Sequence, residues 1–194
     1  MPRTMIFLAL TLVAGSSAIG QKYSGPKCLG PYCIDHEVRA RALFKLLGRP
    51  AQKKSQFDPY CYQSRDGETS LYFYTIDSEP GVIGAVLLSD FPNCLHMGKQ
   101  ATENKLDAWK TTENIKLGSS ENDVVKAYGK PSSQEKIASQ THRHVIQGYR
   151  PSDKLPVIAE KTMFYNDPKE DDLSAAEFGI RGGKVSYIWL SHNE

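Results

Sequence analysis

The stretch GKVSYIWLS, Gly183 to Ser191, is typical of a β-strand. Successive side chains of a strand point to opposite faces, so Val185, Tyr187 and Trp189 are predicted to share one face. The opposite face carries the mainly aliphatic residues that alternate with them. Both faces are therefore largely apolar, and a single helix can cover only one of them.

This stretch closes the second of two predicted β-hairpins. The first hairpin runs from LYFYTI (Leu71–Ile76) through SEPG to GVIGAVLLS (Gly81–Ser89), and the second begins at LSAAEFGI (Leu173–Ile180) and turns at RGG. Runs of β-branched and aromatic residues separated by glycine-bearing turns favour hairpins.

Aromatic residues gather on one predicted face of these hairpins. If the aliphatic faces meet helices, a face formed by Tyr72, Tyr74, Tyr187 and Trp189 is left for another contact. Aromatic side chains with polar tips are enriched at binding surfaces, so these four are candidate binding residues. The alternative is that two repeats bury the aromatic faces against each other.

A short helix is predicted before the second hairpin, in LGSSENDVVKAYGKP (Leu117–Pro131). Ser120 is expected to cap the first turn, and Asp123 to complete a capping box. Gly129 suits the left-handed residue after the last turn, and Pro131 prevents continuation of the helix.

A second helix with the same ending is predicted in IDHEVRARALFKLLGRP (Ile34–Pro50), with Asp35 as its cap. Its apolar stripe is formed by Val38, Leu43, Leu46 and Leu47.

The matched helices and hairpins predict an α+β fold of two tandem helix-plus-antiparallel-sheet units, residues 19–106 with the cysteines and residues 107–194. The second unit has an insertion near residues 145–170, which reads as a loop or a short extra strand. The alternative is one α+β domain whose helix ends and hairpins look alike.

The pattern I-x-L-G-S-S-E-x-D-V-x-x-x-Y-G-x-P at Ile115–Pro131, with the closing GGKVSYIWLS, resembles the small α+β domain of outer-membrane assembly lipoproteins of the BamE/SmpA type. It is also similar to the β-lactamase inhibitory protein fold, in which two such units lie in tandem. Members of these families are binding modules, so the resemblance implies recognition of another macromolecule. The lipid-attachment cysteine of a lipoprotein is replaced here by Ser16.

The first residues, MPRTMIFLALTLVAGSSA, predict a secretory signal peptide over residues 1–18, cleaved after Ala18. The apolar run Met5–Ala14 has about half of the ~20 residues that a spanning helix needs. We therefore expect no transmembrane segment in the mature chain, and a secreted or periplasmic location.

Four cysteines, Cys28, Cys33, Cys61 and Cys94, indicate two disulfides in an oxidising compartment. Four cysteines allow three connectivities, and short loops favour pairing Cys28 with Cys33 and Cys61 with Cys94. A zinc site is the alternative, but the spacing lacks paired C-x2-C knuckles.

No catalytic or cofactor motif is recognisable in the chain. His142 and His144 share one side of a predicted strand, and Asp171 and Asp172 lie in a predicted loop; both pairs read as solvated surface, so neither a metal nor a cofactor is predicted. No GxSxG elbow and no phosphate-binding glycine loop is present. The formal net charge of +2 does not indicate a nucleic-acid partner.

The sequence thus favours a non-enzymatic secreted or periplasmic module that binds another protein or a cell-envelope component through its sheet faces, without assigning an oligomeric state. One alternative is an envelope hydrolase that uses His142, His144 and the acidic loop. Another is a small-ligand sensor that uses the aromatic face.

Overall fold

The computed structural model describes residues 25–49, 59–76, 78–79, 81–91, 94, 106–137, 143–147, 154–166 and 175–192. The predicted signal peptide, residues 1–18, lies outside the described residues. Within these ranges the helical elements are α1 (Ala40–Leu47), the 3-10 turn η2 (Leu106–Ala108) and α2 (Glu121–Tyr128). None of the described helices combines the length and the apolar character needed to cross a membrane.

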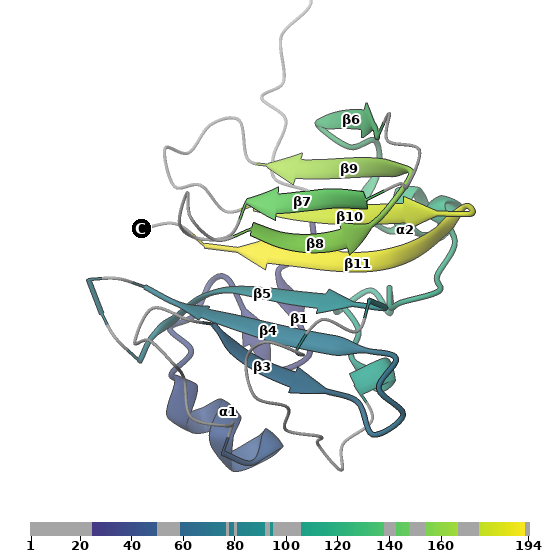
Figure 1. Ribbon diagram of the computed structural model, residues 1–194. Coiled ribbons are helices and arrows are strands. Elements are labelled where there is room, and N and C mark those ends of the chain that lie inside the picture. Colours follow the sequence, from purple (N-terminus) through teal and green to yellow (C-terminus); the bar gives the residue numbers. More distant parts are fainter. Residues whose placement is uncertain are drawn as a thin grey trace, which may run out of the picture.

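One antiparallel sheet dominates the structure, with the strand order β3-β4-β5-β11-β10-β9-β6 (Figure 1). Its strands are β3 (Tyr60–Gln63), β4 (Ser70–Thr75), β5 (Ile83–Ser89), β6 (Ser133–Lys136), β9 (Lys161–Asn166), β10 (Ala175–Arg181) and β11 (Lys184–Ser191). Two small ribbons accompany it, β1 (Cys28–Leu29) with β2 (Tyr32–Cys33), and β7 (Arg143–Gln147) with β8 (Lys154–Ile158).

The predicted fold of two helix-plus-sheet units is wrong, because seven strands drawn from both predicted units form one sheet. The hairpins β4–β5 and β10–β11 form as predicted, but β5 and β11 also pair with each other, with Leu87 opposite Trp189 and Leu88 opposite Ile188. Both strands are apolar on both faces, and an unpaired edge on either one would expose its backbone groups. Pairing the two strands removes both edges at once.

Residues 145–170, predicted to form an exposed loop or a short extra strand, contain two strands. This region supplies β8 and β9, and β9 joins the main sheet between β10 and β6. In β9, Met163 and Tyr165 lie two residues apart, so they share one face of the strand, and both are fully buried in the helix-side core.

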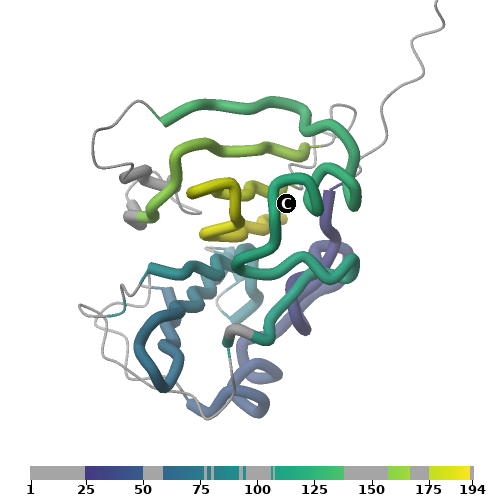
Figure 2. The backbone as a smooth tube through the Cα atoms, turned by 90° about the vertical axis from the view of Figure 1, so that its right-hand side faces the viewer, coloured from purple at the N-terminus to yellow at the C-terminus, as the bar shows by residue number. Residues whose placement is uncertain are grey.

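One face of the sheet is covered by α1, α2 and the β1–β2 ribbon. Leu43 and Leu47 of α1 and Val124 and Tyr128 of α2 belong to the same apolar cluster. The ribbon connects the two halves of the chain, because the Gly30 backbone N–H donates to the carbonyl of Lys110 at 3.0 Å. Figure 2 shows this N-terminal segment, in purple, beside the teal segment that leads to α2.

The two helices begin differently. In α2, the Ser120 side chain accepts from the Asp123 N–H and the Asp123 carboxylate accepts from the Ser120 N–H, so the predicted capping box is confirmed. The predicted cap of α1 by Asp35 is wrong, since α1 begins after Arg39 and has no side-chain cap. Leu46, predicted to be buried, is 50% exposed, because the side of α1 that packs on the core carries Ala40, Leu43 and Leu47.

A β-bulge changes the predicted face of Val185. Gly179 pairs with Tyr187 and Ile180 pairs with Val185, so Ser186 is the extra residue and strand alternation shifts there. Val185 therefore packs on the helix-covered side, whereas Tyr187 lies on the opposite side.

Candidate functional site

The start of α1 is attached to the turn between β4 and β5. The Ala40 N–H donates to the carbonyl of Gly81 at 2.8 Å, and the Ile83 N–H donates to the carbonyl of Val38 at 2.8 Å. Gly81 has φ 114°, a left-handed conformation that favours glycine. The backbone thus holds the first turn of α1 against the sheet end.

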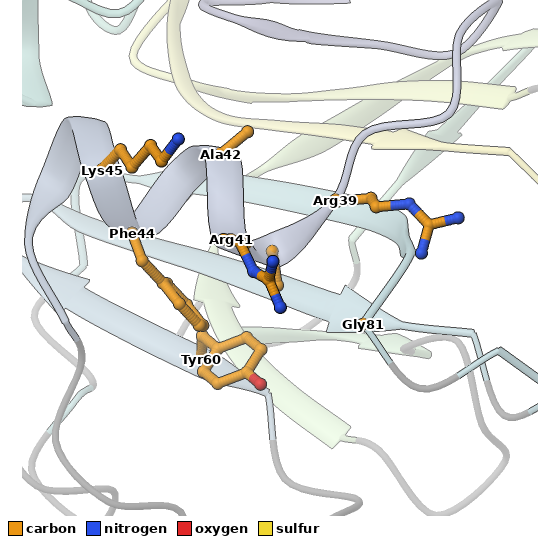
Figure 3. Close-up of a pocket in the computed structure, with 8 residues that line it drawn as sticks. Arg39, Arg41, Ala42, Phe44, Lys45, Tyr60 and Gly81 are labelled. Carbon is orange, nitrogen blue, oxygen red and sulfur yellow. The ribbon is translucent and has the colours of Figure 1, made fainter.

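A hollow of about 520 Å³ lies along this helix start (Figure 3). We call it the α1 groove; its lining residues are Arg39, Ala40, Arg41, Ala42, Phe44, Lys45, Tyr60 and Gly81. The volume falls within the ~300–1,000 Å³ that is typical of ligand sites.

An aromatic pair forms one wall of the α1 groove. Phe44 and Tyr60 meet edge to face, with ring centroids 4.8 Å apart and planes at 80°. Both side chains are half-buried and pack against the helix-side core, which fixes their orientation. Figure 3 shows Arg41 on the same side of α1 as this pair. Burial raises the pKa of the Tyr60 hydroxyl, so this group stays neutral at physiological pH.

Three of the described residues that line the α1 groove, Arg39, Arg41 and Lys45, are cations. The Arg39 guanidinium lies 2.5 Å from the carboxylate of Glu37, and both side chains are largely exposed. Among the described residues, neither Arg41 nor Lys45 forms an ion pair. The groove therefore presents positive charge that the described part of the fold does not neutralise.

The position of these arginines opposes the helix dipole. Anions stabilise the N-terminal end of a helix and cations destabilise it, by about 0.3–1 kcal/mol each at exposed positions. The first turn of α1 contains no acidic residue and carries Arg39 at its cap and Arg41 at its second position. The equally long α2 has Glu121 and Asp123 in its first turn. Local choices that cost stability are expected at functional sites.

The aromatic residues predicted to bind are brought together in the structure, but in its interior. Tyr72, Tyr74, Tyr187 and Trp189 are between 0% and 7% exposed and belong to one cluster on the sheet face opposite the helices. Figure 1 shows β7 and β8 in front of β10 and β11 on this side. Val157 in β8 and Ala159 just after it join the cluster. In this arrangement the four aromatic side chains present almost no surface to a partner.

One buried carboxylate lies on the same face. Glu177 is 5% exposed and accepts a hydrogen bond from the Tyr187 hydroxyl. Burial is the main cause that raises the pKa of Tyr187, and the neighbouring Glu177 carboxylate raises it further. The Tyr187 ring lies over Gly179, where an added Cβ would be 2.0 Å from the ring. This contact links β10 and β11 and has a structural role.

The cysteines form the two predicted disulfides, Cys28–Cys33 and Cys61–Cys94. Cys28, Cys33 and Asp35 are the one group of three potential metal ligands found close together within the described ranges. Both sulfur atoms of that group are bonded to each other and are not thiolate ligands. Two disulfides are consistent with an extracytoplasmic protein.

The remaining chemical candidates from the sequence are only partly described. His144 lies in β7, of which the backbone alone is described, and His142, Asp171 and Asp172 lie outside the described residues. The α1 groove itself is absent from the sequence prediction. Its signal, arginines and no acid at a helix start, was hidden because the helix start was placed at Asp35.

Comparison with known proteins gives no family for the chain. No family model and no curated protein matches it. One solved structure matches, a DUF4309 family protein (YjgB) from Bacillus subtilis subsp. subtilis str. 168, with a TM-score of 0.40 and 12% identity over 80% of this chain and 78% of that chain. A TM-score this low does not establish a shared fold or a shared function. The resemblance to BamE/SmpA-type domains and to the β-lactamase inhibitory protein fold stays a prediction.

Proposed function

We propose that the protein is a non-enzymatic binding module, secreted or periplasmic, that recognises an anionic group on another protein or on a cell-envelope component. The observation that carries the proposal is the α1 groove, where Arg41 and Lys45 have no ion-pair partner among the described residues and border a hollow of about 520 Å³. Cations that oppose the helix dipole are explained if an incoming anion neutralises them.

The burial of the sheet faces supports placing recognition at α1. The helix side of the sheet packs on α1 and α2, and the opposite side contains the aromatic cluster with Val157 and Ala159. The α1 groove combines a fixed apolar wall with accessible positive charge, and binding sites commonly have this composition.

Charge reversal in the α1 groove tests the proposal. The immobilised wild-type protein is expected to capture a component of the exported or envelope fraction, and raised salt should release it. The double variant R41E/K45E should lose this capture. The matched control K126E/K130E makes the same charge change on α2 and just after it, and should retain capture.

Circular dichroism of each variant checks that the fold is retained. The proposal is wrong if no component is captured in a salt-sensitive manner, or if R41E/K45E captures as much as the wild type.

A further inference from the structure

We propose that the ligand of the α1 groove is a carboxylate carried on an apolar or aromatic body. Two sources share this chemistry, an acidic side chain beside an aromatic one in a peptide, and a free aromatic acid. This inference rests on the function proposed above and specifies the ligand class of the same groove.

The apolar requirement comes from the wall of the α1 groove. Phe44 and Tyr60 are held by their edge-to-face contact and by the core beneath them, so they present a fixed surface. A rigid aromatic wall binds apolar groups with little loss of side-chain entropy on association. Ala40, Ala42 and Gly81 add little side-chain bulk around it, which leaves the hollow open to a ring-sized group.

The carboxylate requirement comes from Arg41. Its guanidinium lies on the same side of α1 as the aromatic pair (Figure 3) and has no ion-pair partner among the described residues. An arginine offers a planar fork of donors that matches a carboxylate in a bidentate arrangement. An anion with an apolar body can therefore engage Arg41 and the aromatic wall together.

The charge distribution disfavours a long phosphate polymer. Of the three cations among the described residues that line the α1 groove, Arg39 is already engaged by Glu37. Neutralisation of many phosphates requires a correspondingly large number of cations. The whole chain has 24 basic and 22 acidic residues, so it carries no large excess of positive charge overall. One or two negative charges on a compact ligand match the site better.

Calorimetric titration of the purified protein with defined probes tests the ligand class. The probes are acetyl-Asp-Phe-amide, acetyl-Asn-Phe-amide, acetyl-Asp-Ala-amide, 3-phenylpropionate, inorganic phosphate and polyglutamate. We expect the acidic aromatic peptide to bind at least 10-fold more tightly than the analogue without the carboxylate and the analogue without the ring. Tight binding of 3-phenylpropionate would indicate a free acid as the source, and preference for the peptide would indicate a protein segment.

Variants distinguish bidentate recognition from simple attraction. R41K keeps the positive charge but loses the planar pair of guanidinium donors, so it should weaken binding of the acidic aromatic peptide at least 5-fold. Lys45 lies farther from the aromatic wall in Figure 3, so K45Q should weaken binding less than R41K does. F44A should weaken the peptide and 3-phenylpropionate but leave weak phosphate binding unchanged. The control K126Q, on α2, should bind as the wild type does.

Failure of this inference is distinct from failure of the proposed function. If phosphate or polyglutamate binds as tightly as the acidic aromatic peptide and depends on Arg41, the groove is a general anion site and the ligand class proposed here is wrong. The same conclusion follows if no probe binds while capture from the exported fraction still requires Arg41 and Lys45. If capture is also independent of these two residues, both proposals fail.

Discussion

Replacing Arg41 by glutamate should stabilise the protein while it removes binding. Arg41 occupies the second position of α1, at the positive end of the helix dipole. Exchanging a cation for an anion there changes the dipole interaction by about 0.6 kcal/mol at the lower bound of the measured range. The change also replaces a like-charge pair with Lys45, one turn away, by a Glu-to-Lys pair in the favourable order, for about 0.4 kcal/mol more. The expected gain is about 1 kcal/mol.

Urea unfolding at low ionic strength, with thermal unfolding in parallel, measures this gain. For a chain of this size, 1 kcal/mol corresponds to a rise in Tm of about 2–4 °C. Salt should reduce the gain, because both contributions act between exposed groups. K126E is the matched control, since Lys126 lies in the last turn of α2, where a cation is favourable, and this variant should be less stable than the wild type.

An R41E protein that is equal to or less stable than the wild type at low salt would refute the reasoning. The arginine would then contribute to folding, and its place in α1 would no longer indicate a binding role. A stabilised R41E that still captures its partner would instead remove Arg41 from the binding site.

Three further predictions concern the stability of the scaffold. Burial raises the pKa of Asp90 to about 6, above its ordinary value of 3.8, so its contribution to stability should be present below pH ~4 and be lost as pH rises through 6. Between pH 4 and pH 7.5, the free energy of unfolding of D90N, measured with urea, should fall by less than that of the wild type. G179A should destabilise the sheet by about 1–3 kcal/mol, because the new methyl group would overlap the Tyr187 ring, and the cost should be smaller in a Y187L background. Serine replacement of both cysteines should cost about 4 kcal/mol for the Cys61–Cys94 bridge, which spans 33 residues, and about 2 kcal/mol for Cys28–Cys33, which spans 5.

Contrary outcomes are equally specific. An unchanged pH dependence in D90N would mean that the Asp90 carboxylate is solvated. Full additivity of G179A and Y187L would show that the ring does not lie over Gly179. Equal losses for the two disulfide variants would contradict the dependence on loop length.

Features that depend on a few neighbouring residues were predictable from the sequence. The capping box of Ser120 and Asp123 formed as expected because its two hydrogen bonds span three residues. The hairpins β4–β5 and β10–β11 formed because their turns and strand patterns are local. The disulfide pairing favoured by short loops is also the one observed.

The candidate site was not predictable in the same way. The first turn of α1 begins where the carbonyl of Gly81, far along the chain, accepts from Ala40, and this contact decides that Arg41 lies at a helix end. A cap by Asp35 was locally acceptable, but the backbone of Val38 and Arg39 pairs with the β4–β5 turn and its flank instead. Tertiary hydrogen bonds thus overrode the local signal and changed the interpretation of the arginines.

The sequence by itself determined the short capped helix α2, the two hairpins and the apolar character of both faces of GKVSYIWLS. These properties follow from hydrogen bonds and side-chain alternation within short segments. Only the tertiary structure decided that β5 pairs with β11, that β8 packs beside the aromatic residues, and that Arg41, Phe44 and Tyr60 border one groove. Such contacts join residues distant in the chain, and they are selected by how apolar surface and strand edges are buried together, which no local pattern specifies.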